Sequence, residues 1–175
     1  TFGLDVSDRA VSAPDKPYAC LVLNAMTVKS GALDQDTLLA IYRDLARVIR
    51  DAGIEPVIVL HEPVADRTMS QALAEACDHP PIVELDDARD IKAFIGGSEC
   101  VVTGRYHGLV NGLAAGVPSF AVGWSYKYKE LLNEFECPEA LFDGDPDRFV
   151  GTIEVFLSRP SAREEKRAKL TRISL

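Results

Sequence analysis

The chain of 175 residues is 47% hydrophobic and 26% charged, which is typical of one soluble globular domain with a substantial core. Its net charge of −8 argues against a nucleic-acid partner, because binding to phosphates requires a basic surface. No apolar run approaches the ~20 residues of a transmembrane helix. Four cysteines lie far apart, without the spacing of a metal or redox motif, and this favours buried, reduced thiols in a cytoplasmic protein.

Apolar runs of strand length alternate with segments of helical periodicity along the chain. Residues 1–16 carry turn formers and are expected to be a lead-in or the remnant of an interdomain connection. Strands are predicted at residues 18–23, 56–60, 82–85, 100–103 and 119–123, with a last short strand at 140–142. Helices are predicted over 87–95, 108–115, 130–135 and 145–157, with one from Asp34 or Asp36 to Gly53 and one from Asp66 or Ser70 to Cys77; residues 24–31 are expected to form a loop.

This alternation defines the expected fold class. Strands that are apolar throughout imply a parallel sheet with both faces covered by helices. We therefore predict one doubly wound, Rossmann-like α/β domain over residues 17–175. Ligands of such sheets bind beyond the carboxyl ends of the strands. The loops at 24–30, 61–67 and 124–129 all follow strands, so they should approach the loop at 104–108.

The strongest candidate site is the junction of the strand at 100–103 with the helix that follows it. Here Arg105 and His107 lie between the carboxyl end of a strand and the amino end of a helix, where free N–H groups favour an anion. Arg105 can pair bidentately with a carboxylate or phosphate, and His107 can exchange a proton near neutral pH. The pair suits an anionic substrate that needs proton transfer. Alternatively, Arg105 bonds a carboxylate of a helix or loop and His107 caps backbone groups.

Further candidates follow the neighbouring strands. His61 and Glu62 either contact substrate or bond each other or the backbone. The aromatic residues Trp124, Tyr126 and Tyr128 form either a sugar platform or packing contacts, and Lys127 either contacts an anion or remains solvated.

Three motifs follow one another along the chain: Gly104-Arg105-Tyr106-His107-Gly108, a helix that ends in Gly116-Val117-Pro118, and Trp124 with Lys127 three positions on. In this order and spacing they resemble the pattern of the polysaccharide pyruvyl transferase family. Such enzymes resemble two-domain glycosyltransferases of the GT-B type, and the resemblance implies that these residues belong to the C-terminal half. The resemblance implies transfer of the enolpyruvyl group of phosphoenolpyruvate to a sugar of a polysaccharide, such as an exopolysaccharide, or of its lipid-linked precursor, forming a pyruvate ketal. Phosphoenolpyruvate is then a co-substrate, and no cofactor or metal is expected.

The resemblance also assigns roles to residues. Arg105 and His107 are implied to be catalytic and to hold the donor. Many relatives have an Arg after the first strand, where this sequence has Asn24, with Lys29 as the nearest cation. The predicted substrate-binding set is Asn24, His61, Glu62, Arg105, Tyr106, His107, Gly108, Trp124, Tyr126 and Lys127.

An N-terminal domain outside this sequence is implied as a further partner, since it would supply acceptor contacts across a cleft. The 175-residue chain alone is therefore expected to fold without turnover. Peripheral contact with a lipid-linked acceptor is compatible with this interpretation.

Two other functions remain open. The helix end at 112–118 resembles the nucleotide-binding half of nucleotide-sugar glycosyltransferases and epimerases. In those proteins an acidic residue five positions before the helix-ending glycine usually holds a ribose, whereas this sequence has Asn111, which cannot accept the same charged pair of bonds. A non-catalytic ligand-binding module of the same fold is the third interpretation. It is favoured by Asn24, which stands where many members of the family have a donor-binding Arg.

Overall fold

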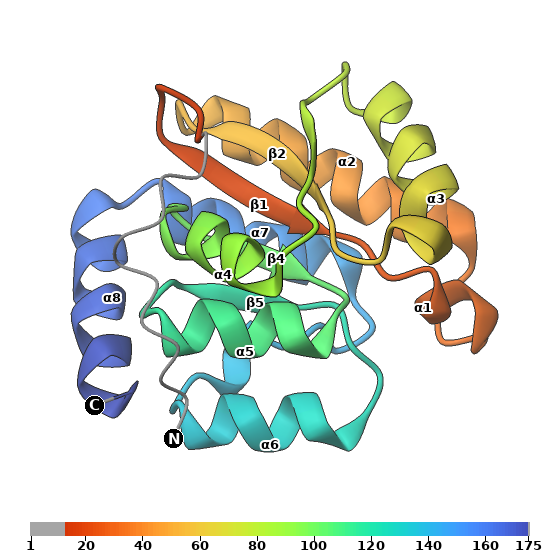
Figure 1. Cartoon of the computed structure of the whole chain (residues 1–175). Coiled ribbons are helices and arrows are strands. Elements are labelled where there is room, and N and C mark those ends of the chain that lie inside the picture. The colour runs from red at the N-terminus through yellow and green to blue at the C-terminus, as the bar shows by residue number, and fades with distance from the viewer. Residues whose placement is uncertain (1–12, 175) are drawn as a thin grey trace.

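The computed structural model describes residues 13–174 and contains a five-stranded sheet in the order β3-β2-β1-β4-β5 (Figure 1). All four pairs of neighbouring strands are parallel. From β1 the chain winds outward to β3, then crosses back to β4 and winds outward to β5. The predicted doubly wound, Rossmann-like fold is confirmed. The strands are β1 (Tyr18–Val22), β2 (Glu55–Leu60), β3 (Ile82–Glu84), β4 (Val101–Thr103) and β5 (Ser119–Ala121).

Helices cover both faces of this sheet. Figure 1 shows α2 and α7 behind it and α4 and α5 in front, with α8 near the amino ends of the strands. None of the helices within residues 13–174 is long and apolar enough to cross a membrane. The helices are α1 (Met26–Lys29), α2 (Gln35–Asp51), α3 (Pro63–Ala76), α4 (Ala88–Gly96), α5 (Tyr106–Ala114), α6 (Tyr126–Glu134), α7 (Pro146–Leu157) and α8 (Pro160–Ser174).

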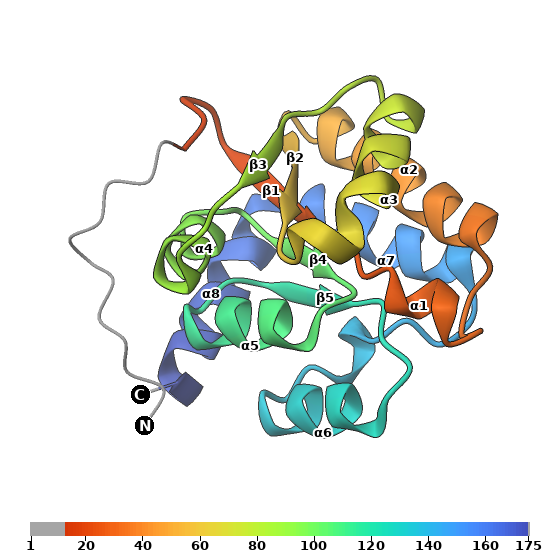
Figure 2. The same ribbon diagram turned by 45° about the vertical axis from the view of Figure 1, so that its right-hand side comes forward.

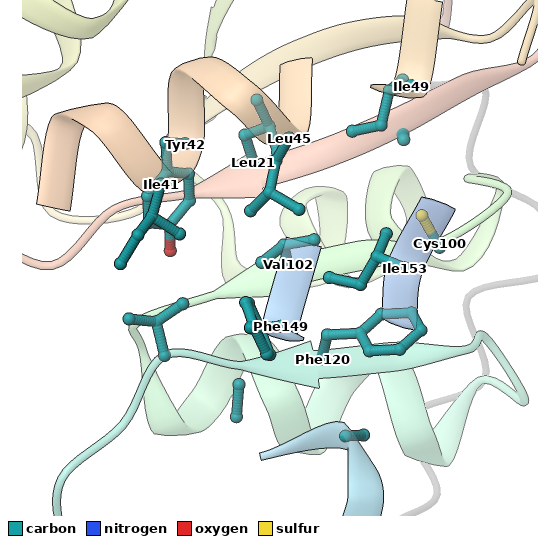
Figure 3. Packing of buried hydrophobic residues seen from close by; sticks show 14 of the residues in the cluster. Leu21, Ile41, Tyr42, Leu45, Ile49, Cys100, Val102, Phe120, Phe149 and Ile153 are labelled. Carbon is teal, nitrogen blue, oxygen red and sulfur yellow. The ribbon is translucent and has the colours of Figure 1, made fainter. Parts of the chain in front are cut away.

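The core has two parts because successive strand residues point to opposite faces of the sheet. Leu21 of β1 packs in the cluster that contains residues of α2 and α7, whereas Cys20 and Val22 pack with residues of α4. Figure 3 shows the first cluster, in which Leu45 of α2 and Ile153 of α7 lie against the strands. Burial on both faces explains why the central strand β1 is apolar at every position.

The four cysteines are buried free thiols, as the sequence indicates. Burial raises the pKa of Cys77 to about 11 and that of Cys100 to about 12. These thiols are therefore protonated near neutral pH and are poor nucleophiles.

Several predicted helix boundaries are confirmed because an aspartate caps the helix start. Asp34 accepts a hydrogen bond from the Thr37 N–H at 2.9 Å, which selects the first of the two predicted starts of α2. Asp145 does the same for α7, accepting from the Arg148 N–H at 3.1 Å. Such caps satisfy N–H groups that lack partners within the helix.

Other predicted boundaries are wrong. The expected loop at 24–31 contains the short helix α1. Helix α3 begins at Pro63 rather than at Asp66 or Ser70, because the fixed φ of proline suits the first helical position. Helix α5 begins two residues before the predicted Gly108.

The segment after β5 also differs from the prediction. Helix α6 begins at Tyr126 rather than near residue 130, since Ser125 caps it. The predicted strand at 140–142 is a 3-10 turn, Pro138–Ala140, followed by a single parallel bridge between Ala121 and Leu141. Of the predicted lead-in, residues 1–12 lie outside the described residues, and 13–16 form neither helix nor strand.

The close approach of α5 to the sheet requires Gly112. A Cβ at this position would overlap Ser119 Oγ and lie 2.7 Å from Val101 Cγ1. We predict that Gly112→Ala lowers the free energy of unfolding by about 1–3 kcal/mol, the usual cost of overpacking a core. Urea denaturation of the two proteins measures the difference.

Gly151 of α7 offers a matched control because a Cβ there would meet nothing within 4 Å. Gly151→Ala should raise the free energy of unfolding by up to ~1 kcal/mol, since alanine favours the helix. Equal effects of the two substitutions would contradict the packing argument.

Candidate active site at the carboxyl edge of the sheet

The loops that follow β1, β2, β4 and β5 meet at one edge of the sheet, as predicted. Figure 2 shows α1 and the starts of α3 and α6 on the same side of the molecule. Two long-range hydrogen bonds converge on one carbonyl: Asn24 Nδ2 and the Tyr128 hydroxyl both donate to the Gly104 oxygen at 2.8 Å. The end of β4 is thereby joined to the loop after β1 and to α6.

Asn24 belongs to the framework of this edge. The residue is buried, and its Oδ1 accepts the Met26 N–H at 3.0 Å while its Nδ2 bonds Gly104. A Cβ on Gly104 would lie only 3.0 Å from Asn24 Cβ, so glycine permits the close contact between the two loops. Both polar ends of the Asn24 amide are used within the protein.

Arg105 makes a buried ion pair with Asp66 of α3. Arg105 Nε donates to Asp66 Oδ2 at 3.0 Å, and Nη2 donates to Oδ1 at 2.8 Å and to Oδ2 at 2.7 Å. The Asp66 side chain is 1% exposed and that of Arg105 is 18% exposed. Asp66 Oδ1 also accepts the Ala25 N–H at 2.9 Å. Of the two interpretations offered by the sequence, a helix carboxylate as the partner of Arg105 is the one that the structure shows.

The sequence did not identify Asp66 as a site residue, because its position suggested a helix start. Strand β1 lies between β2 and β4, and neighbouring strands are ~4.8 Å apart, so Asp66 and Arg105 meet across the end of β1. The long arginine side chain spans that gap. One signal in the sequence could have identified it: Asp66 lies in the segment 61–67, which was expected to approach Arg105, and an arginine at such an edge needs a carboxylate partner.

The backbone of Arg105 is fixed as well. Thr103 Oγ1 accepts the Arg105 N–H at 2.9 Å and donates to the Arg105 carbonyl at 3.0 Å. Gly108 is buried in the first turn of α5, where a Cβ would lie 2.6 Å from the same Thr103 Oγ1. Gly108 therefore lets the helix start pack against the strand end.

Two imidazoles face each other beside this ion pair. The rings of His61 and His107 are 6.5 Å apart between centroids and nearly parallel, at 13°. Tyr106 lies edge-on to His107 at 6.2 Å and to Tyr128 at 5.6 Å. His107 is exposed, whereas His61 is half-buried and its buried Nδ1 has no hydrogen-bond partner among residues 13–174.

The environment of His61 favours its neutral form. Burial lowers its pKa, and the nearby Arg105 cation lowers it further, although the Glu62 carboxylate acts in the opposite direction. Protonation of His61 is therefore less favourable than protonation of an exposed histidine.

The remaining predicted residues lie at the same edge but on its outer surface. Trp124 is 45% exposed and Tyr126 is 67% exposed, and Lys127 follows in the first turn of α6. Glu62 is exposed at the start of α3, where its carbonyl accepts the N–H groups of the helix. Lys127 and His107 thus lie at one edge, as predicted.

Metal binding has no prepared site in the part of the chain that the structure covers. Between residues 13 and 174, His, Cys, Asp and Glu form no group of three or more that could hold an ion. The edge instead combines a fixed cation, a helix start and two imidazoles. This combination can bind an anion and transfer protons.

The fold and the position of this edge define the class: a Rossmann-like α/β structure of the kind found in GT-B glycosyltransferases and epimerases. A putative UDP-N-acetylglucosamine 2-epimerase from Listeria monocytogenes is similar with a TM-score of 0.69 and 14% identity, over 93% of this chain and 44% of that chain. The S. aureus MnaA-UDP co-structure is similar with a TM-score of 0.64 and 12% identity, over 90% of this chain and 39% of that chain. The glycosyltransferase SnogD from Streptomyces nogalater is similar with a TM-score of 0.52 and 14% identity, over 94% of this chain and 43% of that chain.

At such identities the likeness concerns the fold alone, and the chain spans less than half the length of each of these proteins. The polysaccharide pyruvyl transferase family model matches residues 78–126. This short stretch contains Arg105, His107 and the helix end at Pro118, so the resemblance predicted from the sequence is confirmed there. Lys127 lies one residue beyond it. No curated protein matches the sequence.

The lowered pKa of His61 predicts a pH-dependent contribution to stability. Below about pH 6.5 the unfolded chain binds a proton at this imidazole more readily than the folded protein does, so the free energy of unfolding should fall as the pH falls. His61→Gln removes this term, and its stability profile between pH 7 and 5 should be flatter. Chemical denaturation at each pH measures both slopes, and equal slopes would contradict the assignment.

Proposed function

We propose that this chain is the donor-binding half of a polysaccharide pyruvyl transferase. The observation that carries the proposal is the junction of β4 and α5, where Arg105 and His107 lie within the family-matched stretch and next to His61. The donor is phosphoenolpyruvate, and the acceptor is a sugar of a polysaccharide or of its lipid-linked precursor.

The chemistry requires proton transfer at an anionic substrate. Protonation of the methylene carbon of the enolpyruvyl group leaves a cation next to oxygen, which a sugar hydroxyl attacks as it loses its proton. A second hydroxyl of the same sugar then displaces phosphate and closes the ketal. The exposed His107 is placed to exchange these protons with the substrate, and the nearly parallel ring of His61 lies beside it.

Charge at the site limits how the donor binds. Asp66 largely neutralises Arg105, so a substrate with a carboxylate and a phosphate needs further positive groups. The start of α5 offers free N–H groups, and Lys127 and Lys29 follow the adjacent strands. Donor binding in this proposal relies on the helix start and these lysines together with the outer side of Arg105.

A nucleotide-sugar-dependent glycosyltransferase or epimerase is the second candidate, favoured by the structural neighbours. MnaA was solved with UDP, and SnogD is a glycosyltransferase. Asn111 on α5 argues against this alternative, since it cannot provide the pair of charged acceptor oxygens that a ribose contact uses.

A ligand-binding module without catalysis is the third candidate. Such a module would bind the donor in the complete gene product but never turn it over.

The proposal also covers the complete enzyme, of which this chain is taken to be one part. A preceding domain closes the cleft and contacts the acceptor, and the reaction takes place in the cytoplasm, at a lipid-linked saccharide or an exopolysaccharide precursor. The 175-residue chain provides one wall of that cleft.

Ligand titration tests the function directly. Calorimetry of the 175-residue chain should detect binding of phosphoenolpyruvate and none of UDP, whereas the nucleotide-sugar alternative predicts the reverse. The same chain should form no ketal, because catalysis needs groups held on both sides of a cleft. Measurable turnover by this chain alone would show that the preceding domain is dispensable.

His107 is expected to act in proton transfer. In the complete gene product, His107→Gln should lower kcat by ~10²- to 10⁴-fold with a smaller change in the KM for phosphoenolpyruvate, since glutamine keeps hydrogen bonding but cannot shuttle a proton. Steady-state kinetics with melting curves give both quantities.

His79→Asn is the control, because His79 lies in an exposed turn between α3 and β3 and has a left-handed φ of 49° that asparagine tolerates. Its kcat should equal that of the wild type. An unchanged kcat with a lower Tm in the His107 variant would make His107 a structural residue.

A further inference from the structure

We propose that Asp66 is a positioning residue that holds the Arg105 guanidinium in one orientation before the donor arrives. This inference rests on the proposed function, because Arg105 is taken to contact the donor. It assigns a role to a carboxylate on α3 that lies outside the family-matched stretch.

The burial of Asp66 makes the pairing obligatory. A carboxylate that is 1% exposed is strongly unfavourable unless opposite charge and hydrogen bonds compensate it. Arg105 supplies the charge through Nε and Nη2, and the Ala25 N–H supplies a further hydrogen bond. Arg105 therefore cannot turn its whole fork toward a ligand without leaving Asp66 as an unpaired buried charge.

The pairing also defines which part of Arg105 meets the donor. Asp66 uses Nε and Nη2, so Nη1 is the amino group outside this pair. The backbone of Arg105 is fixed by Thr103 at the same time. A cation held at both ends is preorganised, and such preorganisation contributes most where charge develops in the transition state.

Another ion pair on the same helix shows the contrast. Arg67, the next residue after Asp66, pairs with Glu84 of β3 at 2.7 Å, but both side chains are at least 37% exposed. Exposed pairs of this kind contribute little to stability or orientation. Glu84→Gln is therefore a control that removes a carboxylate from an arginine without disturbing the edge at Arg105.

The first experiment compares Asp66→Asn with Glu84→Gln in the complete gene product. Asparagine keeps the size of the side chain but cannot hold the guanidinium through two charged oxygens. We expect kcat for ketal formation to fall by ~10- to 100-fold with little change in the KM for phosphoenolpyruvate, because the cation remains but is misplaced. Glu84→Gln should leave both unchanged. A folded Asp66→Asn protein with wild-type kcat and KM would overturn the inference.

A double-mutant cycle tests whether Asp66 acts through Arg105. It also provides a variant that can be measured if Asp66→Asn alone folds poorly. The pair Asp66→Asn with Arg105→Gln leaves no unpaired buried charge, so this double variant should fold. If Asp66 acts through Arg105, the kcat of the double variant should match that of Arg105→Gln alone, with both measured below the Tm of each variant so that folded proteins are compared. Losses that multiply would show that Asp66 acts independently and would overturn the proposal.

The last measurement needs no substrate. In nitrogen-15 spectra, the Arg105 Nε–H should exchange slowly with water in the wild type, because it is bonded to the buried Asp66, and quickly in Asp66→Asn. Arg105→Lys identifies the signal by its loss. A rapidly exchanging wild-type Nε–H would refute the positioning role. Failure of the wild-type enzyme to use phosphoenolpyruvate would instead refute the proposed function, while this measurement would still decide the Asp66 pairing.

Discussion

The ion pair between Arg105 and Asp66 is the contact on which the carboxyl edge of the sheet depends. It connects the loop after β4 to α3, and through the Ala25 N–H it also includes the loop after β1. Since Asp66 is buried, loss of Arg105 leaves the carboxylate charge without compensation inside the protein. The three central strands of the sheet are thus joined at their ends by one set of charged hydrogen bonds.

This pair also sets the electrostatic character of the site. Because Asp66 balances Arg105, the edge has a fixed cation without a large excess of positive charge. His61 remains neutral beside it, since burial and the guanidinium both lower its pKa. A neutral imidazole that faces the exposed His107, with a helix start adjacent, is a suitable environment for an anionic donor that must be protonated and then attacked by a hydroxyl.

The fold was largely predictable from residue patterns. Continuous apolar runs located four of the five strands, and β3 was predicted as a short strand between two helices. The carboxyl ends of parallel strands share an edge, so the gathering of the loops around Arg105 followed from topology. The errors fell where local signals compete. Asp66 resembles a helix cap, but Pro63 begins the helix, and the polar and aromatic residues at 126–129 favour a loop although Ser125 caps α6.

By itself, the sequence determined the fold class, the edge that carries the site and the motif around Arg105 and His107, because periodicity and motif spacing are local properties of the chain. Only the tertiary structure decided that Arg105 is held by Asp66, 39 residues away, and that Asn24 bonds the Gly104 carbonyl rather than facing outward. The physical reason is that such contacts depend on which strands are neighbours. Because β1 lies between β2 and β4, the side chain of Arg105 spans the end of β1 to reach the buried carboxylate of Asp66. The loop after β1 contacts the same carboxylate through the Ala25 N–H.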